Sequence, residues 1–237
     1  MSWCQGRWSP RQGAYPRATW RELCLASIVA IVLVAGAIPL DELLNRLSIR
    51  RPVFHSERDF QLELAWEAKL ADPGIQVFLE TRPARGMHLD VAFEKDGCYT
   101  AVELKYLTRG WSGEVNGQHY DLKTHSAHDR GRYGVVRDVW RVEQFASRPN
   151  SNGAVVVLTN DPSYLSPSSR ASRDAAFRIH DGAVLAGLRA WDGSPPSRDM
   201  VDLKLAGSYQ LQWSDYSTGD IGPRLWQLVI EVDRGVG

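Results

Sequence analysis

The sequence predicts an α/β domain in which helices cover both faces of a mixed β-sheet. Two long amphipathic patterns, at residues 55–70 and 127–146, indicate helices. Residues 75–79 and 89–107 supply three strand-like runs between them, and residues 153–159 supply a fourth after them. This order of helix, three strands, helix and strand favours one α/β domain, followed by a C-terminal extension.

Composition limits the classes of protein to consider. Of 237 residues, 43% are hydrophobic and 24% are charged, which is enough for one substantial core. The formal net charge is zero, so an interaction with nucleic acid must depend on local charge. The three cysteines, Cys4, Cys24 and Cys98, show neither zinc-ligand spacing nor a disulfide framework, which favours a reducing compartment such as the cytoplasm.

Residues 1–38 differ from the rest and form an atypical N-terminal segment. Four arginines precede an uncharged apolar run at residues 23–40, and Ala35-Gly36-Ala37 resembles a signal-peptidase site. The run is also about as long as the shortest membrane spans, and as a span it would place the domain outside the cytoplasm. An over-extended start of translation and a buried core helix are the other interpretations. We expect membrane association or export only if the run is a genuine anchor or signal.

The first helices are recognised by their ends. Residues 41–47 form a short amphipathic helix that Arg-Arg-Pro at 50–52 ends. Ser56 is a good N-cap for the helix at 55–70, Glu57 and Asp59 lie in its first turn, and Asp72-Pro73-Gly74 ends it. The expected buried stripe of this helix consists of Phe60, Leu64, Ala68 and Leu70.

Residues 89–107 predict a β-hairpin around Asp96-Gly97, a dipeptide typical of a two-residue type I′ turn. Counting outward from the turn places Asp90 opposite Glu103, and Lys105 shares their face because alternate residues point the same way. The opposite, apolar face is expected to hold Leu89, Val91, Phe93, Val102 and Leu104.

The later elements follow from similar patterns. The segment containing Gly110, Gly113 and Gly117 is expected to be a loop. The helix at 127–146 has an apolar stripe of Val135, Val139, Val142 and Phe145. Beyond it, the sequence predicts a buried strand at 153–159, a short helix at 175–179, a loop at 192–200, and strands at 209–213 and 225–232.

Two carboxylates directly opposite each other on paired strands repel. A divalent cation removes this conflict, and Mg²⁺ prefers carboxylate oxygens while also accepting phosphate oxygens. A lysine beside such an ion orients water or stabilises negative charge on phosphorus. Asp90, Glu103 and Lys105 therefore suit metal-assisted phosphodiester hydrolysis. The alternative is a solvated sheet face with ordinary alternating charges.

The pattern of Asp90 followed by Glu103-x-Lys105 in a hairpin after a helix resembles the PD-(D/E)XK, or restriction-endonuclease-like, nuclease superfamily. The segments HSERDFQLELAW, AVELKY, GRYGVVRDVWRVE and VVVLTNDPSY, in this order, resemble a bacterial group within it. The resemblance covers roughly residues 40–235, although residue 89 is Leu where the family name has Pro. It implies a nuclease core at 39–165 and a mostly β extension at 166–237 that packs on it.

The resemblance also implies roles for individual residues. Asp90, Glu103 and the carbonyl of Leu104 would bind Mg²⁺, for which Mn²⁺ can substitute, and Lys105 would act at the attacking water. Glu57 best matches the helical acid of the family, with Glu63 and Glu67 as alternatives. The expected activity is cleavage of DNA rather than RNA. The alternative is a catalytically inactive nuclease-fold module that binds nucleic acid or a protein partner, and a homodimer is compatible with either.

Nucleic-acid contacts are expected from Arg109, Lys123, Arg132 and Tyr133, which would surround the site with positive charge. Arg132 and Tyr133 share a helix face with Asp129, and either residue would contact a phosphate or position Lys105. The alternative for Arg132, Tyr133 and the rest of this helix face is a solvated surface with ion pairs such as Asp138–Arg141. His119, His125 and His128 are expected to lie in a substrate-contacting loop rather than in a metal site.

Overall fold

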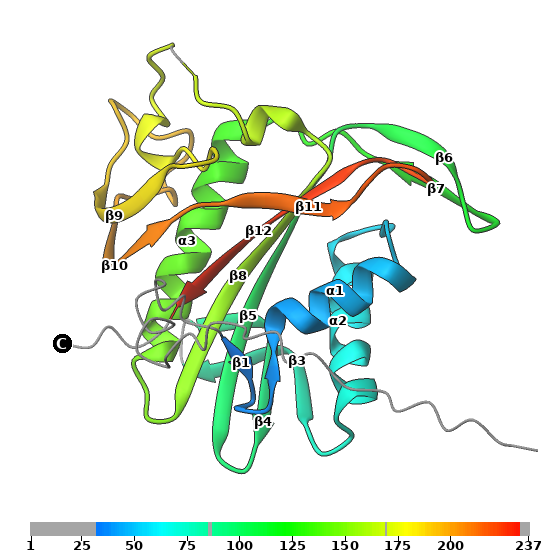
Figure 1. Ribbon diagram of the computed structural model, residues 1–237. Coiled ribbons are helices and arrows are strands. Elements are labelled where there is room, and N and C mark those ends of the chain that lie inside the picture. Colours follow the sequence, from blue (N-terminus) through cyan, green and yellow to red (C-terminus); the bar gives the residue numbers. More distant parts are fainter. Residues whose placement is uncertain (1–31, 85–86, 169, 233–237) are drawn as a thin grey trace, which may run out of the picture. The chain divides into compact units, whose positions relative to one another are not determined.

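The computed structural model describes residues 32–84, 87–168 and 170–232 (Figure 1). In chain order its elements are β1 (Leu33–Val34), β2 (Ile38–Pro39), α1 (Leu40–Arg50), α2 (Glu57–Ala71), β3 (Gln76–Ala84), β4 (Met87–Lys95), β5 (Cys98–Leu107), β6 (Trp111–Val115), β7 (Gln118–Leu122), α3 (His128–Ala146), β8 (Ser151–Thr159), the 3₁₀-helices η2 (Pro162–Tyr164) and η3 (Ala175–Phe177), β9 (Val184–Arg189), β10 (Leu203–Gln210), β11 (Trp213–Ser217) and β12 (Leu225–Val232).

The central sheet has six strands in the order β11-β12-β8-β5-β4-β3. The β5–β8 pair is parallel and the other pairs are antiparallel, which confirms the predicted α/β class with a mixed sheet. β12 pairs with β8 from Trp226↔Thr159 to Val232↔Gly153. The C-terminal segment therefore does more than pack on a core, because β11 and β12 are themselves strands of the central sheet.

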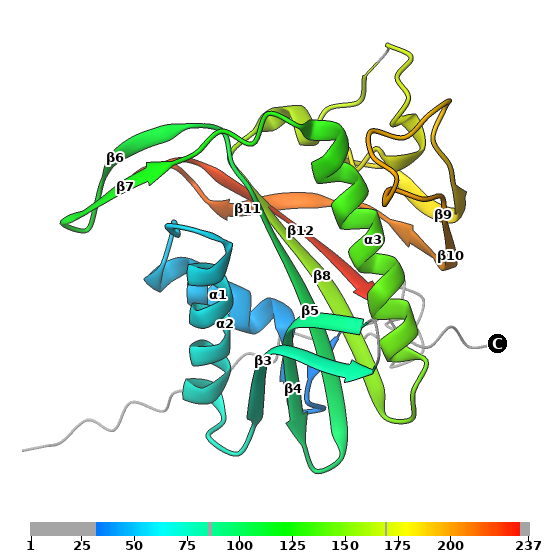
Figure 2. The ribbon, with the colours of Figure 1, turned by 180° about the vertical axis from the view of Figure 1, so that it is seen from behind.

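Helices cover the two faces of this sheet (Figures 1 and 2). On one face, Phe60 and Leu64 of α2 share a buried cluster with Val102 and Leu104 of β5. On the other face lies the α3 cluster, whose buried residues include Val135, Val139 and Val142 of α3, Val155 and Val157 of β8, and Leu228 and Ile230 of β12. A second small sheet, formed by β9 and β10, packs on the outer side of α3.

The start of α2 follows the expected capping chemistry. The Ser56 hydroxyl accepts a hydrogen bond from the Asp59 amide at 3.2 Å. Phe60, Leu64 and Ala68 are fully buried, as predicted. Leu70 is 56% exposed, so its assignment to the stripe is wrong. It lies two residues beyond Ala68 and therefore about 200° around the helix from the buried face.

The β4–β5 hairpin has the predicted register, with Lys95↔Cys98 flanking the turn and pairing as far as Val91↔Val102. Asp96 and Gly97 have φ of 51° and 76°, the left-handed values that a type I′ turn requires. The β4–β5 pairing ends one residue before Asp90, because β4 and β3 bend away from β5 (Figure 2). The bend also moves Leu89 into a small cluster with Phe145 of α3, so its predicted place with Val91 and Phe93 is wrong.

Two segments differ from their predicted structure. The expected glycine-rich loop is the antiparallel hairpin β6–β7, which turns at Asn116-Gly117 with φ of 51° and 76°. The expected strand at 209–213 is the end of β10 and the start of β11. By contrast, β12 has the predicted bounds, and η3 lies within the predicted short helix.

The end of the apolar N-terminal run packs into the same core as the helices and the sheet. Val32, Val34 and Leu40 are fully buried. Between β1 and β2, Ala35 and Gly36 have φ of 49° and 68°, and the Ala35 amide donates to the Thr100 hydroxyl at 2.9 Å. The segment that resembles a cleavage site is thus a tight turn. The rest of the N-terminal segment, residues 1–31, lies outside the described residues, so most of the possible anchor or signal does too. Within the described ranges, no helix is both long and apolar enough to cross a membrane.

Candidate active site

The candidate site lies where β4 separates from β5. Beyond Val102, two amides of β5 are bound by carboxylates instead of by a neighbouring strand. The Leu104 amide donates to Asp90 Oδ2 at 2.8 Å, and the Tyr106 amide donates to Glu57 Oε2 at 3.0 Å. The bend in the strand pair therefore brings the expected acid of β4 and the expected acid of α2 to the same edge of β5.

The Glu103 side chain is fully buried under α3, and its negative charge is only partly compensated by Arg141. Its Oε2 accepts from Arg141 Nη2 at 3.0 Å, while its Oε1 is buried and accepts no hydrogen bond from any described residue. Burial, followed by the charges of Asp138 and Asp90, raises the pKa of Glu103 to about 9. The carboxyl group consequently favours its protonated form at neutral pH unless a cation approaches.

Lys105 is held between carboxylates. Its Nζ lies 2.7 Å from Asp138 Oδ2 and 4.0 Å from Glu57 Oε1, and it donates to the Leu104 carbonyl at 2.9 Å. Burial alone would lower the pKa of Lys105, but the charges of Asp138 and Glu57 outweigh burial and raise it. Lys105 is therefore an ammonium group with a fixed orientation.

Asp138 and Arg141 of α3 complete the site, and the alternative of a solvated pair does not hold. Asp138 is fully buried, and Arg141 donates to it, to Glu103 and to the His88 carbonyl. A signal for this was present in the sequence, since residues 135, 138, 139 and 142 follow the i, i+3, i+4, i+7 pattern of a buried stripe. An aspartate within such a stripe requires a buried cationic partner.

We refer to six residues as the charged cluster: Glu57, Asp90, Glu103, Lys105, Asp138 and Arg141. The face that carries Glu103 and Lys105 is covered by α3, so the alternative of a solvated sheet face does not hold. The charged cluster contains four acids and two bases. With the buried and unpartnered Glu103 Oε1, this excess of acids fits a divalent cation at Asp90 and Glu103.

Arg132 and Tyr133 do not reach the charged cluster, and the partner of Lys105 on α3 is Asp138. Arg132 Nη1 donates to Asp174 Oδ2 at 2.8 Å, and its side chain is largely buried. Tyr133 packs against Phe177 and Trp191. Both side chains thus join α3 to the C-terminal region.

Arg109 and Lys123 lie near each other, just beyond the end of β5. Their neighbour Thr108 donates to the Lys123 carbonyl at 2.6 Å, and the Asn160 side chain holds the backbone of Arg109. Both residues are exposed, so their charges are available to a ligand.

The other polar residues singled out in the sequence have separate partners. Glu63 and Glu67, the alternatives to Glu57, pair with Arg50, and Glu63 also pairs with Arg51. Of the three histidines expected in one loop, only His125 lies outside the helices and strands, where its Nδ1 accepts from the Thr108 amide at 3.0 Å. His119 lies on β7, and His128 is the first residue of α3, with its Nε2 2.8 Å from Asp161 Oδ2.

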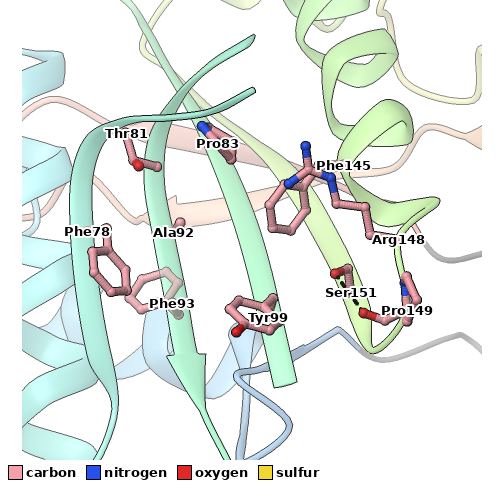
Figure 3. Close-up of a pocket in the computed structure, with 10 residues that line it drawn as sticks. All are labelled: Phe78, Thr81, Pro83, Ala92, Phe93, Tyr99, Phe145, Arg148, Pro149 and Ser151. Atoms are coloured by element: carbon pink, nitrogen blue, oxygen red, sulfur yellow. Dashed lines mark hydrogen bonds between the residues drawn. The ribbon is translucent and has the colours of Figure 1, made fainter. Parts of the chain in front are cut away.

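A hollow of about 300 Å³ lies apart from the charged cluster, between the β3–β5 sheet and the end of α3 (Figure 3). Aromatic side chains, among them Phe78, Tyr99 and Phe145, form much of its lining. No member of the charged cluster lines it. The charged cluster is therefore the stronger candidate for chemistry on an anionic substrate.

Comparisons of the chain with models of protein families, with curated proteins and with solved structures found no match. The geometry of the charged cluster is therefore the basis for the functional proposal.

Proposed function

We propose that the chain is a metal-dependent nuclease that hydrolyses phosphodiester bonds, with DNA as its substrate. The observation that carries the proposal is the convergence of Asp90, Glu103 and Lys105, with Glu57, where β4 separates from β5. The resemblance of Asp90 and Glu103-x-Lys105 to the PD-(D/E)XK pattern supports the same conclusion.

Asp90, Glu103 and the carbonyl of Leu104 would hold Mg²⁺, or Mn²⁺ in its place. When bound, such an ion supplies positive charge to phosphate oxygens and lowers the pKa of a bound water. The residues of the chain fit this role because Glu103 Oε1 is buried without a hydrogen-bond donor among the described residues. A cation would also relieve the repulsion of Glu103 by Asp138 and Asp90.

Lys105 provides a fixed positive charge beside the proposed ion. Asp138 and the Leu104 carbonyl orient its ammonium, and the raised pKa keeps it protonated. A preorganised cation stabilises the negative charge that develops on a phosphoryl group. Lys105 thus acts as an electrostatic group toward the substrate rather than as a base.

Arg109 and Lys123 are proposed to contact the DNA backbone. They are exposed, and they lie two and sixteen residues beyond Leu107, the last residue of β5. Contacts with phosphate position a nucleic acid without reading its sequence.

Cleavage assays on the full-length chain test the proposal. We expect Mg²⁺ or Mn²⁺ to support cleavage of duplex or single-stranded DNA. Asp90→Asn and Lys105→Met should each lower kcat at least about 100-fold, because each removes a group that acts on the reacting phosphate. Asp90→Asn keeps an oxygen that can accept from the Leu104 amide, so it tests the charge with little change in folding.

Matched controls are Asp121→Asn and Lys204→Met, which remove the same charges at exposed positions on β7 and β10. Both should cleave at the wild-type rate, and thermal unfolding of every variant verifies folding. Cleavage by Asp90→Asn at the wild-type rate would contradict the site. DNA binding by a wild-type chain that cleaves no tested DNA with either ion would instead support an inactive nuclease-fold module.

A further inference from the structure

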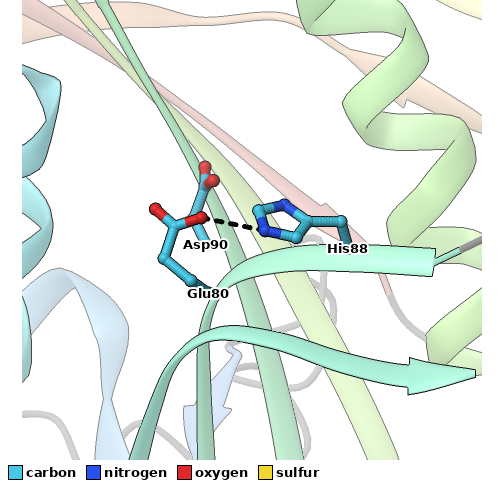
Figure 4. Close-up of side chains that lie close together, drawn as sticks. All are labelled: Glu80, His88 and Asp90. Atoms are coloured by element: carbon cyan, nitrogen blue, oxygen red, sulfur yellow. Dashed lines mark ion pairs between the residues drawn. The ribbon is translucent and has the colours of Figure 1, made fainter.

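Three potential metal ligands, Glu80, His88 and Asp90, converge on the bent part of the β3–β4 pair (Figure 4). One ligand atom from each residue lies within 4.8 Å of the ligand atoms of the other two. His88 Nε2 is 2.9 Å from Glu80 Oε2. Glu80 and His88 are not members of the charged cluster, so they need a separate explanation.

The register of β3 and β4 explains why these side chains meet. Leu79 pairs with Val91 and Thr81 pairs with Leu89, which places Glu80 beside Asp90 between these two pairs. Glu80 has φ of 51°, a left-handed conformation that is unfavourable for a residue with a long side chain. The strained residue thus lies at the bend and carries one of the three ligands.

We propose that Glu80, His88 and Asp90 form a second cation site, which binds a first-row transition-metal dication in preference to Mg²⁺. Imidazole nitrogen is a good ligand for Zn²⁺ and related ions, whereas Mg²⁺ prefers oxygen ligands alone. One imidazole nitrogen with two carboxylate oxygens therefore favours a transition-metal dication over Mg²⁺. The proposal does not depend on cleavage of DNA.

The geometry needs only small side-chain rotations. Two ligand atoms at about 2.1 Å from one ion lie about 3 to 4 Å apart. The three ligand atoms here lie within 4.8 Å of one another, and His88 Nε2 and Glu80 Oε2 are 2.9 Å apart. The side chains of His88 and Glu80 are 38% and 47% exposed, so an ion can reach them from solvent. Three protein ligands also leave a coordination position for water or for an anionic ligand.

Arg141 and Asp90 connect this site with the charged cluster. Arg141 Nη1 donates to the His88 carbonyl at 3.3 Å while its Nη2 donates to Glu103. Asp90 Oδ2 accepts from the Leu104 amide, and the carboxylate has a second oxygen to offer an ion. The two proposed sites therefore share one acid and one cationic support but differ in their remaining ligands.

Calorimetric titration of the full-length chain with Zn²⁺, in buffer with excess Mg²⁺, tests the proposal. We expect one Zn²⁺ to bind through this site. His88→Ala and Glu80→Gln should each weaken that binding at least about tenfold, because each removes one of three ligands. The matched control is His119→Ala, which removes an exposed histidine on β7 and should leave Zn²⁺ binding unchanged.

The two proposals fail separately. Glu103→Gln and Lys105→Met should retain Zn²⁺ binding whether or not the wild-type chain cleaves DNA, since neither residue belongs to the second site. Circular dichroism verifies that His88→Ala is folded. Equal Zn²⁺ affinity in His88→Ala and the wild-type chain, or no Zn²⁺ binding by the wild-type chain, would overturn the second site.

Discussion

Glu103 of β5 and Asp138 of α3 are buried together between the two elements, and the charge of Asp138 raises the energy of the charged form of Glu103. Arg141 and Lys105 compensate for part of this cost. Buried charges are retained at a cost in stability when function requires them. The pKa of Glu103 is raised to about 9, so the titration of this residue in the absence of metal gives a test of its burial.

We expect the unfolding free energy of the chain, measured with a chelator, to fall as pH rises from about 5 to about 8. The ordinary carboxyl pKa of 4.5 is raised to about 9 in Glu103. The folded state therefore holds a proton that the unfolded state has lost, and raising the pH favours unfolding. One such proton contributes at most about 1.4 kcal/mol per pH unit. Urea unfolding at several pH values measures this slope.

Glu103→Gln should reduce that slope because glutamine does not titrate. The control Glu114→Gln, at an exposed position on β6, should keep the wild-type slope. Equal slopes in Glu103→Gln and the wild-type chain would show that Glu103 titrates normally.

At the scale of elements, local rules predicted the parts of the fold that depend on local chemistry. Ser56 identified the start of α2, and Asp96-Gly97 identified the register that places Glu103 and Lys105. The same rule applied to Asn116-Gly117 would have predicted β6–β7, where neighbouring glycines suggested a loop.

The remaining differences have a non-local origin. Leu89 changes face because the β3–β4 pair bends, and Asp138 is buried because Lys105 and Arg141 are available in the folded chain. The contact of Leu89 with Phe145 and the contact of Asp138 with Lys105 each join residues far apart in the sequence, and no local sequence pattern identifies both partners. The Asp90 side chain likewise reaches the Leu104 amide only because the β4–β5 pairing stops at Val91.

Two glycines of α3 provide a matched test of its packing. A Cβ at Gly134 would lie 3.6 Å from Lys105 Cε, which is an ordinary contact. We expect Gly134→Ala to stabilise the chain by about 0.5 to 1 kcal/mol through helix propensity. A Cβ at Gly131 would lie 2.5 Å from the hydroxyl oxygen of Tyr164, a fully buried side chain. Gly131→Ala should therefore destabilise the chain, by about 1 kcal/mol or more.

Thermal and urea unfolding of both variants measure the difference. The two substitutions have the same helix propensity, so the comparison isolates the steric contact with Tyr164. Equal stability of the two variants would contradict the placement of α3 against Tyr164.

At the scale of the whole molecule, the C-terminal third is part of the sheet rather than an accessory. β12 contributes Leu228 and Ile230 to the α3 cluster and pairs with β8 from Gly153 to Thr159. A chain that stops after residue 165 would leave this edge of β8 unpaired and expose the apolar surface that β12 covers.

We therefore expect such a truncated chain to aggregate or to lose cooperative unfolding, as measured by size-exclusion chromatography and circular dichroism. Deletion of residues 193–195, which lie in an exposed loop, is the control and should leave cooperative unfolding intact. A monomeric truncated chain with a sharp thermal transition would show that the core folds without β12.

The place of β12 also has a consequence for the order of events during synthesis. The ribosome makes β5, α3 and β8 well before residues 225–232 emerge, and β8 keeps one open edge until then. Val155 and Val157, which pair with Glu103 and Lys105 on one side, face Ile230 and Leu228 on the other. A nascent chain therefore completes the support of its charged cluster only near the end of translation, so any activity that depends on this cluster would arise only then.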